Sequence, residues 1–191
     1  MHKNLLYISL LLLLFFFPTG ALGQTTIGDV DPTTDNPILS QPHGTNIISC
    51  SAYNNITYSG HTIEQINATE GDYEQLWGQP DSITNPSPWS KNYSYGTNSL
   101  SYNTTDNYTQ GMKILNNQWP IKVLGKEIRV GNSFSEFQQK FGSNLNIIYK
   151  PAINPSYVVS FNCSENEYDG LLIYFSPATH KVQKIRYFVN P

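Results

Sequence analysis

The chain has 191 residues, of which 13% are charged and 13% are aromatic, and its formal net charge at pH 7 is −3. The 11 Lys and Arg residues form no run or stripe, which excludes the basic surface that a nucleic-acid-binding protein needs. Abundant Tyr, Asn, Ser and Thr with few charges are typical of exported, β-rich proteins. Nucleic acid is therefore not an expected partner.

The first residues predict a signal peptide over residues 1–23. A short basic start precedes an apolar run from Leu5 to Phe17, and the small residues Ala21 and Gly23 occupy the −3 and −1 positions of a cleavage site. A membrane anchor, the rival interpretation, needs roughly 20 apolar residues, and this run is shorter. We therefore expect a secreted or periplasmic protein with no membrane span after cleavage.

Residues 24–47 contain Pro, Gly, Asp and Thr without any period, which predicts an extended or disordered leader. Asp29, Asp31 and Asp35 lie within it at a spacing that could ligate Ca²⁺. Because the segment lacks the Gly and the closing Glu of an EF-hand, a solvated linker is the favoured interpretation.

Residues 48–118 predict a first unit of a helix and a β-meander. The segments IISCSAY and TYSGHTIEQI alternate, which indicates two strands. Thr69 is a candidate N-cap with Asp72 as its capping-box partner, and Gly78 is a candidate stop for a short helix with an aromatic face. DSITNPSPWSKN is expected to be a loop, KNYSYGTNSLSYN two strands that turn at Gly96, and YTQGMKILNN a further strand.

The pattern recurs in residues 119–191. The pairs that share one spacing are Thr69–Ser133, Asp72–Glu136, Tyr73–Phe137, Trp77–Phe141 and Gly78–Gly142. Gly60-His61-Thr62-Ile63 also matches Gly125-Lys126-Glu127-Ile128 with one residue of slippage. The strands SYVVSFNCS, LLIYFS and KVQKIRYFV follow the second helix. The expected fold class is α+β, with two tandem units that each have a short helix packed on a small antiparallel β-sheet.

A short capped helix that ends in LWGQPDSI, followed by a meander that closes on DGLLIYFSPATHKVQKIRYF, resembles the β-lactamase inhibitor protein-like fold, of which BamE-like lipoproteins are single-unit relatives. The resemblance implies two tandem units and the general habit of binding proteins. The second copy departs from the pattern, with Ser143-Asn144 in place of Gln79-Pro80. The lipid-bearing Cys and the bridge inside each unit are also missing, so no specific binding residue carries over.

Two cysteines, Cys50 and Cys163, are far apart in the sequence. Export makes a disulfide between them possible, and such a long closed loop is worth roughly 4–5 kcal/mol in loop-entropy models. The alternative is two unpaired, buried small side chains, and the disulfide is favoured. Sequons for N-glycosylation, which matter only in a eukaryotic source, occur at Asn55, Asn67, Asn92, Asn103, Asn107 and Asn162.

The titratable residues do not form a constellation typical of catalysis. His61 and Glu64 have ligand-like spacing, but in a strand they would face opposite ways, so a surface His is favoured. His180 lies in a turn, where solvated polarity explains it. Glu165, Glu167 and Asp169 indicate an exposed acidic turn. We expect no catalytic residue, no metal site and no cofactor.

Aromatic residues are the candidate binding residues. They are Trp89, Tyr93, Tyr95 and Tyr102, because Tyr among small polar residues suits adaptable recognition surfaces. Trp77 belongs to the core by its helical position, whereas Trp89 fits exposure and burial equally well. Tyr93 and Tyr95 share a strand face, and the sequence leaves open whether that face meets the helix or solvent.

The favoured function is an exported, non-enzymatic binding protein that recognises another protein in the envelope or outside the cell, as an inhibitor or immunity factor would. One alternative is a carbohydrate- or small-ligand-binding module, which exposed aromatic rings would favour. The other is a small secreted hydrolase that uses the acidic turn near Asp169.

Overall fold

The computed structural model describes residues 41–150, 156–163 and 170–189. These residues belong to the second of two units, Pro37–Pro191, and the first unit, Met1–Asn36, lies outside them. The predicted signal peptide and most of the predicted leader fall outside the described residues. So do six acidic residues singled out above, namely Asp29, Asp31, Asp35, Glu165, Glu167 and Asp169.

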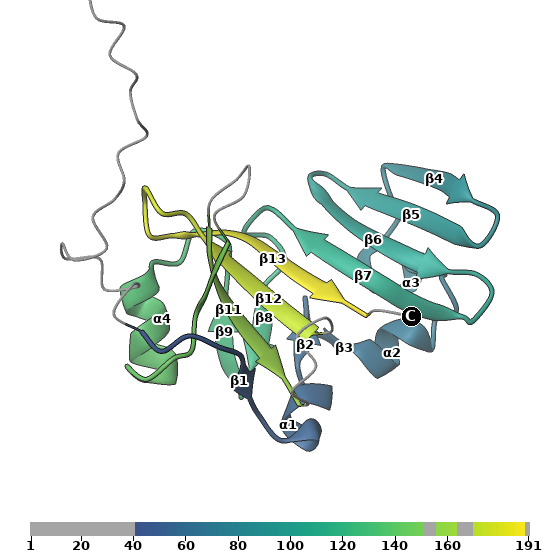
Figure 1. The fold of residues 1–191 in the computed structure, drawn as a ribbon. Coiled ribbons are helices and arrows are strands. Elements are labelled where there is room, and N and C mark those ends of the chain that lie inside the picture. Colours follow the sequence, from purple (N-terminus) through teal and green to yellow (C-terminus); the bar gives the residue numbers. More distant parts are fainter. Residues whose placement is uncertain (1–40, 151–155, 164–169, 190–191) are drawn as a thin grey trace, which may run out of the picture. The chain divides into compact units, whose positions relative to one another are not determined.

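Short helices and many strands make up the described part of the chain (Figure 1). In order, the elements are β1 (Asn46–Ile47), α1 (Cys50–Asn54), β2 (Thr57–Tyr58), β3 (His61–Thr62), α2 (Ile63–Asn67), α3 (Glu74–Trp77), β4 (Ser82–Ser87), β5 (Ser90–Tyr95), β6 (Asn98–Asn103), β7 (Tyr108–Ile114), β8 (Ile121–Val123), β9 (Lys126–Ile128), α4 (Phe134–Phe141), β10 (Ile148–Lys150), β11 (Ser156–Asn162), β12 (Gly170–Phe175) and β13 (Val182–Phe188). The fold is therefore mainly β, with helices of a few turns at most.

A large mixed sheet of nine strands has the order β1-β11-β12-β13-β7-β6-β5-β4, and β10 also pairs with β11. Its pairings are antiparallel except for β1, which lies parallel to β11. The centre of this sheet is the β7–β13 pair, which joins strands from the two predicted units. The prediction of one small sheet for each unit therefore differs from the structure, because both halves of the chain share one large sheet.

A second, antiparallel sheet of four strands has the order β3-β2-β8-β9 and consists of two hairpins. The turn residues Ser59 and Gly60 have φ of 50° and 97°, and Leu124 and Gly125 have φ of 51° and 73°. Positive φ at both central residues is the signature of the tight hairpin turn that suits twisted strands. The glycines at the matching positions of the two predicted repeats thus occupy equivalent turns.

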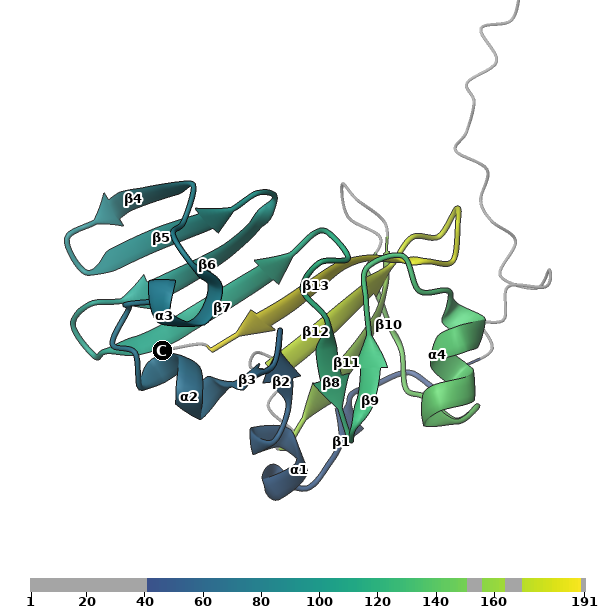
Figure 2. The same cartoon turned by 180° about the vertical axis from the view of Figure 1, so that it is seen from behind.

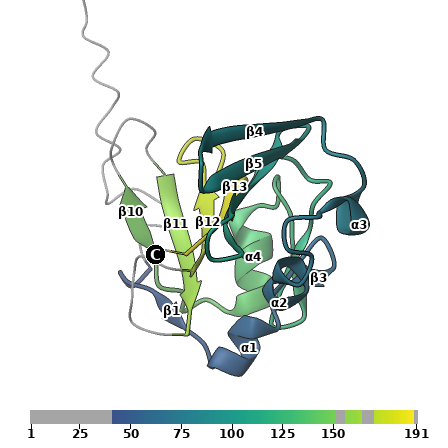
Figure 3. The same cartoon turned by 90° about the vertical axis from the view of Figure 1, so that its right-hand side faces the viewer.

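The helices α2, α3 and α4 and the small sheet lie on the same face of the large sheet (Figures 2 and 3). The core fills the space between these layers. Tyr58 on β2 packs edge-on against Tyr187 on β13, with ring centroids 5.6 Å apart. Phe134 and Phe137 on α4 pack against Phe175 on β12 at 5.2 and 5.4 Å. Helices this short are marginal alone, so their burial against the sheet stabilises them.

The second predicted helix is confirmed. Ser133 is the N-cap of α4, its hydroxyl accepts a hydrogen bond from the Glu136 amide, and the Glu136 carboxylate accepts from the Ser133 amide. Gly142, with φ of 94°, ends the helix. The strands expected in KNYSYGTNSLSYN, YTQGMKILNN, SYVVSFNCS, LLIYFS and KVQKIRYFV are confirmed as β5, β6, β7, β11, β12 and β13.

Several expectations for the first half of the chain are corrected by the structure. In the segment IISCSAY only Ile47 belongs to a strand, β1, and helix α1 begins at Cys50, where the Ser49 hydroxyl caps it by accepting from the Ala52 amide. In TYSGHTIEQI only β2 and β3 are extended, and Thr62 and Gln65 form a capping box for α2. Thr69 is therefore not an N-cap, and its hydroxyl instead donates to the Ile66 carbonyl at the end of α2.

The segment DSITNPSPWSKN, expected to be a loop, contains the edge strand β4. Its side chains are almost all exposed, so hydrophobic alternation does not reveal it. Pro86 and a register irregularity between Thr84 and Ser87 interrupt its pairing with β5. Both features protect a sheet edge from pairing with another chain.

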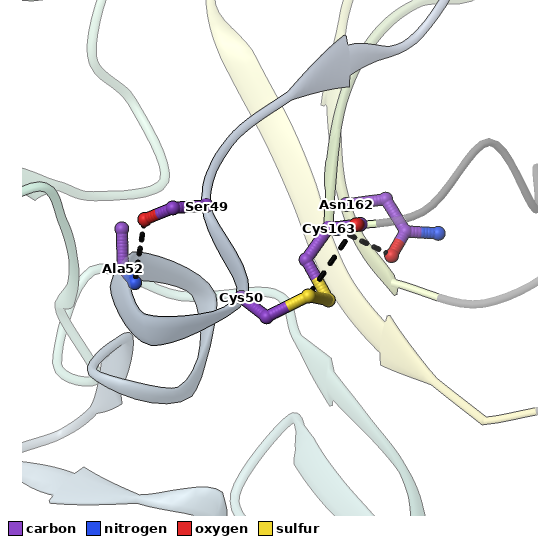
Figure 4. The surroundings of a disulfide bond; sticks show 5 residues. All are labelled: Ser49, Cys50, Ala52, Asn162 and Cys163. Atoms are coloured by element: carbon purple, nitrogen blue, oxygen red, sulfur yellow. Dashed lines mark hydrogen bonds between the residues drawn. A yellow bond between two sulfur atoms is a disulfide. The ribbon is translucent and has the colours of Figure 1, made fainter.

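The predicted disulfide between Cys50 and Cys163 is confirmed (Figure 4). It joins the first residue of α1 to the residue after β11, with the two Cα atoms 4.7 Å apart and a sequence separation of 113. The last residues of the predicted leader also belong to this region, because β1 pairs with β11 and the Gly44 amide donates to the Ile147 carbonyl. The start of the described chain is thus attached to its second half.

Candidate functional site

The four predicted binding residues occupy different environments. Trp89 is 61% exposed, in the turn between β4 and β5. Tyr93 and Tyr102 are buried, at 6% and 4% exposure, and their rings lie edge-on to Tyr73 with centroids 4.8 and 6.1 Å away. Tyr95 is partly buried. The structure therefore brings the three tyrosines together beneath the helical layer and leaves Trp89 apart from them.

The sequence left undecided whether the strand face shared by Tyr93 and Tyr95 meets the helices or solvent. Their contacts show that this face meets the helices. Tyr95 packs against Trp77 and Trp119, with ring centroids 6.2 and 5.4 Å apart. Trp77 and Trp119 stack on each other at 4.8 Å. Trp77 is partly buried and packs on the core, as its helical position predicts. This aromatic cluster stabilises the fold.

Burial also controls the chemistry of these tyrosines. Loss of hydration raises the pKa of Tyr95 to about 12, and the nearby carboxylates of Glu74 and Asp72 contribute. Burial raises the pKa of Tyr73 even further, although a hydrogen bond to the Thr109 hydroxyl partly opposes the shift. Both phenols stay neutral at physiological pH, so Tyr73 serves as a hydrogen-bonding and packing group and Tyr95 as a packing group.

The opposite face of the large sheet has a different composition. We call it the polar face and define it by the side chains of Thr84, Asn92, Ser94, Ser99, Ser101, Lys113, Lys184 and Arg186. Register places these residues side by side: Thr84 pairs with Asn92, Ser94 with Ser99, and Asn92 with Ser101. These residues line an open hollow of about 720 Å³ that extends across β4, β5, β6, β7 and β13.

Three cations lie in the middle of the polar face. Arg186 on β13 is directly opposite Lys113 on β7, and Lys184 is two residues from Arg186 on the same strand. The ammonium nitrogen of Lys184 lies 3.9 Å from the ring centroid of Tyr174, and the guanidinium of Arg186 lies 5.7 Å from that of Phe188. None of the described residues that line the hollow is a carboxylate. The hollow is thus a neutral polar surface with a positive centre.

Sequence reasoning missed the polar face, although the signal for half of it was present. Ser, Thr and Asn alternate with Tyr and Leu along β5 and β6, so once the aromatic residues are assigned to the core, the small polar ones must face outward. The pairing of Lys113 with Arg186 had no such signal, because it depends on which distant strands meet.

A second, smaller hollow of about 130 Å³ lies beside α3. Its lining includes Tyr93, Tyr95 and the exposed Ile83, together with the acidic residues Asp72 and Glu74. It is far too small for a protein segment of any length, and it belongs to the edge of the aromatic cluster.

The described titratable residues that the sequence singled out occupy a hairpin, a short helix and a turn. Among all residues that the structure describes, no group of three or more His, Cys, Asp or Glu side chains is placed to hold a metal ion. His61 lies in β3 and Glu64 in α2, and the His61 ring packs edge-on against Trp77 at 5.7 Å. His180 is a turn residue with φ of 53°. The acidic turn proposed for a hydrolase lies outside the described residues.

None of the described helices has the length and apolar character needed to cross a membrane. Comparisons with models of known families, with curated proteins and with solved structures found no match to this chain.

Proposed function

We propose that this chain is an exported, non-enzymatic binding protein that recognises another protein through the polar face. The observation that carries the proposal is the separation of roles between the two faces of the large sheet. Helices, the small sheet and nearly all large aromatic side chains are on one face, and the other offers an open hollow of about 720 Å³. A surface of this kind binds by complementarity, so the mechanism is occlusion of a partner surface without chemistry.

The proposal also includes two tandem units, residues 48–118 and 119–191, in an inhibitor-like arrangement. Each half contributes a hairpin, a helical segment that begins with a capping box, and four strands. Equivalent elements meet: β2 pairs with β8, and β7 pairs with β13. Two halves that are related in this way place the β7–β13 pair at the centre of the proposed interface.

The Cys50–Cys163 disulfide supports the proposal of export, because such bonds persist in oxidising compartments. Secretion or a periplasmic location, and a partner in the envelope or outside the cell, follow from the same proposal.

The second candidate function is a carbohydrate- or small-ligand-binding module. Its supporting observation is the lining of the hollow, which is rich in hydroxyl and amide groups, together with the exposed Trp89. Against it, the aromatic rings of Tyr93 and Tyr102 are in the core, where no sugar can stack on them.

Capture from the secreted and envelope fractions of the source, read by mass spectrometry, tests the proposal. A face variant, Ser94→Tyr with Ser99→Tyr, fills the hollow at two directly paired positions. A control variant, Ser51→Tyr with Gln118→Tyr, places the same rings at exposed positions elsewhere.

We expect one stoichiometric protein partner that is lost with the face variant and kept with the control. Capture that survives the face variant would contradict the polar face as the interface. Retention on a glycan array without any protein partner would replace the proposal with the carbohydrate alternative.

A further inference from the structure

We infer that the partner presents carboxylate side chains to the centre of the polar face, where Lys113 and Arg186 receive them. The inference rests on the proposed binding function and names the chemistry of the partner: an acidic segment of a folded protein.

The first supporting observation is that Lys113 and Arg186 are directly opposite each other in the antiparallel β7–β13 pair. Like charges at directly opposed positions destabilise a sheet. The chain is not short of acidic residues, since it has 14 Asp and Glu against 11 Lys and Arg. An unfavourable pair at the centre of the largest sheet therefore calls for a reason outside the stability of the isolated fold.

The second observation is that none of the described residues around this pair neutralises its charge. The described lining of the hollow combines hydroxyl, amide and apolar groups with cations and includes no carboxylate. Within the described part of the chain, neither Lys113 nor Arg186 forms an ion pair with an acidic side chain. A carboxylate from a partner would supply the missing opposite charge.

The small sheet provides a contrast within the same chain. There Lys122 on β8 is directly opposite Glu127 on β9, which is the favourable arrangement of charges. The fold thus places a cation opposite an anion on the small sheet and a cation opposite a cation on the polar face.

The spacing of the cations fits a short acidic segment. Neighbouring strands lie about 4.8 Å apart and alternate residues along a strand about 6.8 Å apart, so Lys113, Arg186 and Lys184 form a compact triangle. The Phe188 and Tyr174 rings beside Arg186 and Lys184 hold these two side chains by cation–π contact. Neutral Ser and Asn side chains surround the triangle and can hydrogen-bond to the rest of a peptide segment.

A long polyanion fits less well. A nucleic acid or a sulfated glycan chain needs a row of cations that follows its backbone. Here the cations are confined to two adjacent strands, and β4, β5 and β6 contribute neutral side chains to the hollow. A few carboxylates on a folded protein match this pattern best.

The test uses the purified protein, isotope-labelled for NMR, and two synthetic octapeptides, one alternating Glu with Gly and the other alternating Gln with Gly. At low salt we expect the Glu peptide to shift the amide signals of Ser99, Ser101, Lys113 and Arg186, and the Gln peptide to leave them unchanged. In the double variant Lys113→Gln/Arg186→Gln, binding of the Glu peptide should weaken by about tenfold or more. The matched control, Lys91→Gln/Lys122→Gln, removes the same charge from exposed positions outside the hollow and should bind as the unaltered chain does.

Thermal unfolding shows whether the variants fold. The double variant should have a Tm equal to or above that of the unaltered chain, because it removes the like-charge pair. Three outcomes would each overturn the inference. Both peptides could bind equally well, the shifted amide signals could lie on other surfaces only, or the control variant could lose as much affinity for the Glu peptide as the double variant. A response to inorganic phosphate but not to the Glu peptide would also overturn it, in favour of a small-anion site.

The capture experiment separates this inference from the proposed function. Suppose that the face variant, Ser94→Tyr with Ser99→Tyr, loses the partner while Lys113→Gln/Arg186→Gln keeps it. The polar face is then the interface, and the inference that the partner is acidic is wrong. If the charge variant loses the partner and the Lys91→Gln/Lys122→Gln control keeps it, both statements gain support. A partner kept by the face variant would contradict the proposed function itself, whatever the peptide experiment yields.

Discussion

Tyr73 lies where the helical layer meets the large sheet, and its ring and its hydroxyl have separate roles. The ring contacts Trp77, Tyr93 and Tyr102, and the hydroxyl shares a hydrogen bond of 2.8 Å with the Thr109 hydroxyl on β7. Both residues are fully buried, so no solvent replaces the hydrogen bond if one partner is removed. This pair attaches the segment before α3 to the sheet.

Tyr73→Phe should lower the free energy of unfolding by about 1–3 kcal/mol, because it leaves the buried Thr109 hydroxyl without its partner. Urea unfolding followed by circular dichroism measures the change. The double variant Tyr73→Phe/Thr109→Val should recover most of the loss, since it removes both polar groups. Additive losses in the double variant would show that the hydroxyl pair is unimportant and that packing dominates.

The raised pKa of Tyr95 predicts how the free energy of unfolding changes with pH in the alkaline range. Its pKa is raised from 10.0 in an unfolded chain to about 12 in the fold, so folding favours the neutral phenol. The unfolded chain loses this proton first as pH rises, and therefore the contribution of Tyr95 is complete below pH 10 and is lost as pH approaches about 12. We expect a decline of stability over this window that is smaller in Tyr95→Phe. Identical pH profiles for the two proteins, measured by chemical denaturation, would refute the role of Tyr95.

At the scale of elements, capping boxes define where two helices begin. Ser133 with Glu136 and Thr62 with Gln65 make the same reciprocal hydrogen bonds between side chain and backbone amide. The Glu136 carboxylate has a lowered pKa because it accepts hydrogen bonds from Ser133. A capping box involves residues only three positions apart, so local sequence alone can predict it.

Ser133→Ala should destabilise the protein by about 1 kcal/mol, because the first turn of α4 loses its side-chain acceptor. The control is Ser143→Ala, an exposed position just beyond the end of the same helix, where a change within about 0.5 kcal/mol is expected. Denaturant midpoints of the two variants measure the difference. Equal effects at both positions would mean that the cap of α4 adds nothing to global stability.

At the scale of the whole described molecule, the disulfide and the central strand pair attach distant parts of the chain to each other. Cys50 and Cys163, with a sequence separation of 113, close a long loop, and β7 and β13 join the two halves within one sheet. Both connections are long-range, but only the covalent disulfide persists in the unfolded chain and restricts its freedom, whereas the strand pair forms on folding.

Cys50→Ala/Cys163→Ala should lower the free energy of unfolding by about 4–5 kcal/mol if loop entropy dominates, and by less if the reduced chain retains structure. Chemical denaturation with and without a reducing agent measures this effect. The reducing agent should bring the unaltered chain to the stability of the variant and leave the variant unchanged. A variant as stable as the oxidised chain would show that this bond contributes nothing to the fold.

The amino-acid sequence by itself determined the features that depend on neighbouring residues. The capping box at Ser133, the stop at Gly142 and the strands from β5 to β7 and from β11 to β13 follow from caps, alternation and short apolar runs within a few residues. The pairing of the two cysteines could also be predicted, because there was only one possible pair. The helix α1 and the edge strand β4 could not, since their side chains are largely exposed and lack a clear hydrophobic period.

Only the tertiary structure decided which face of each strand is buried and which distant residues meet. Alternation shows that Tyr93 and Ser94 point in opposite directions, but the packing of Tyr73 on Tyr93 is what assigns the aromatic face to the core. The polar face, and the like-charge pair of Lys113 with Arg186 at its centre, exist because β7 and β13 pair in one particular register. Burial and register are properties of the whole packed chain, since a slip by one residue would exchange the two faces of a strand.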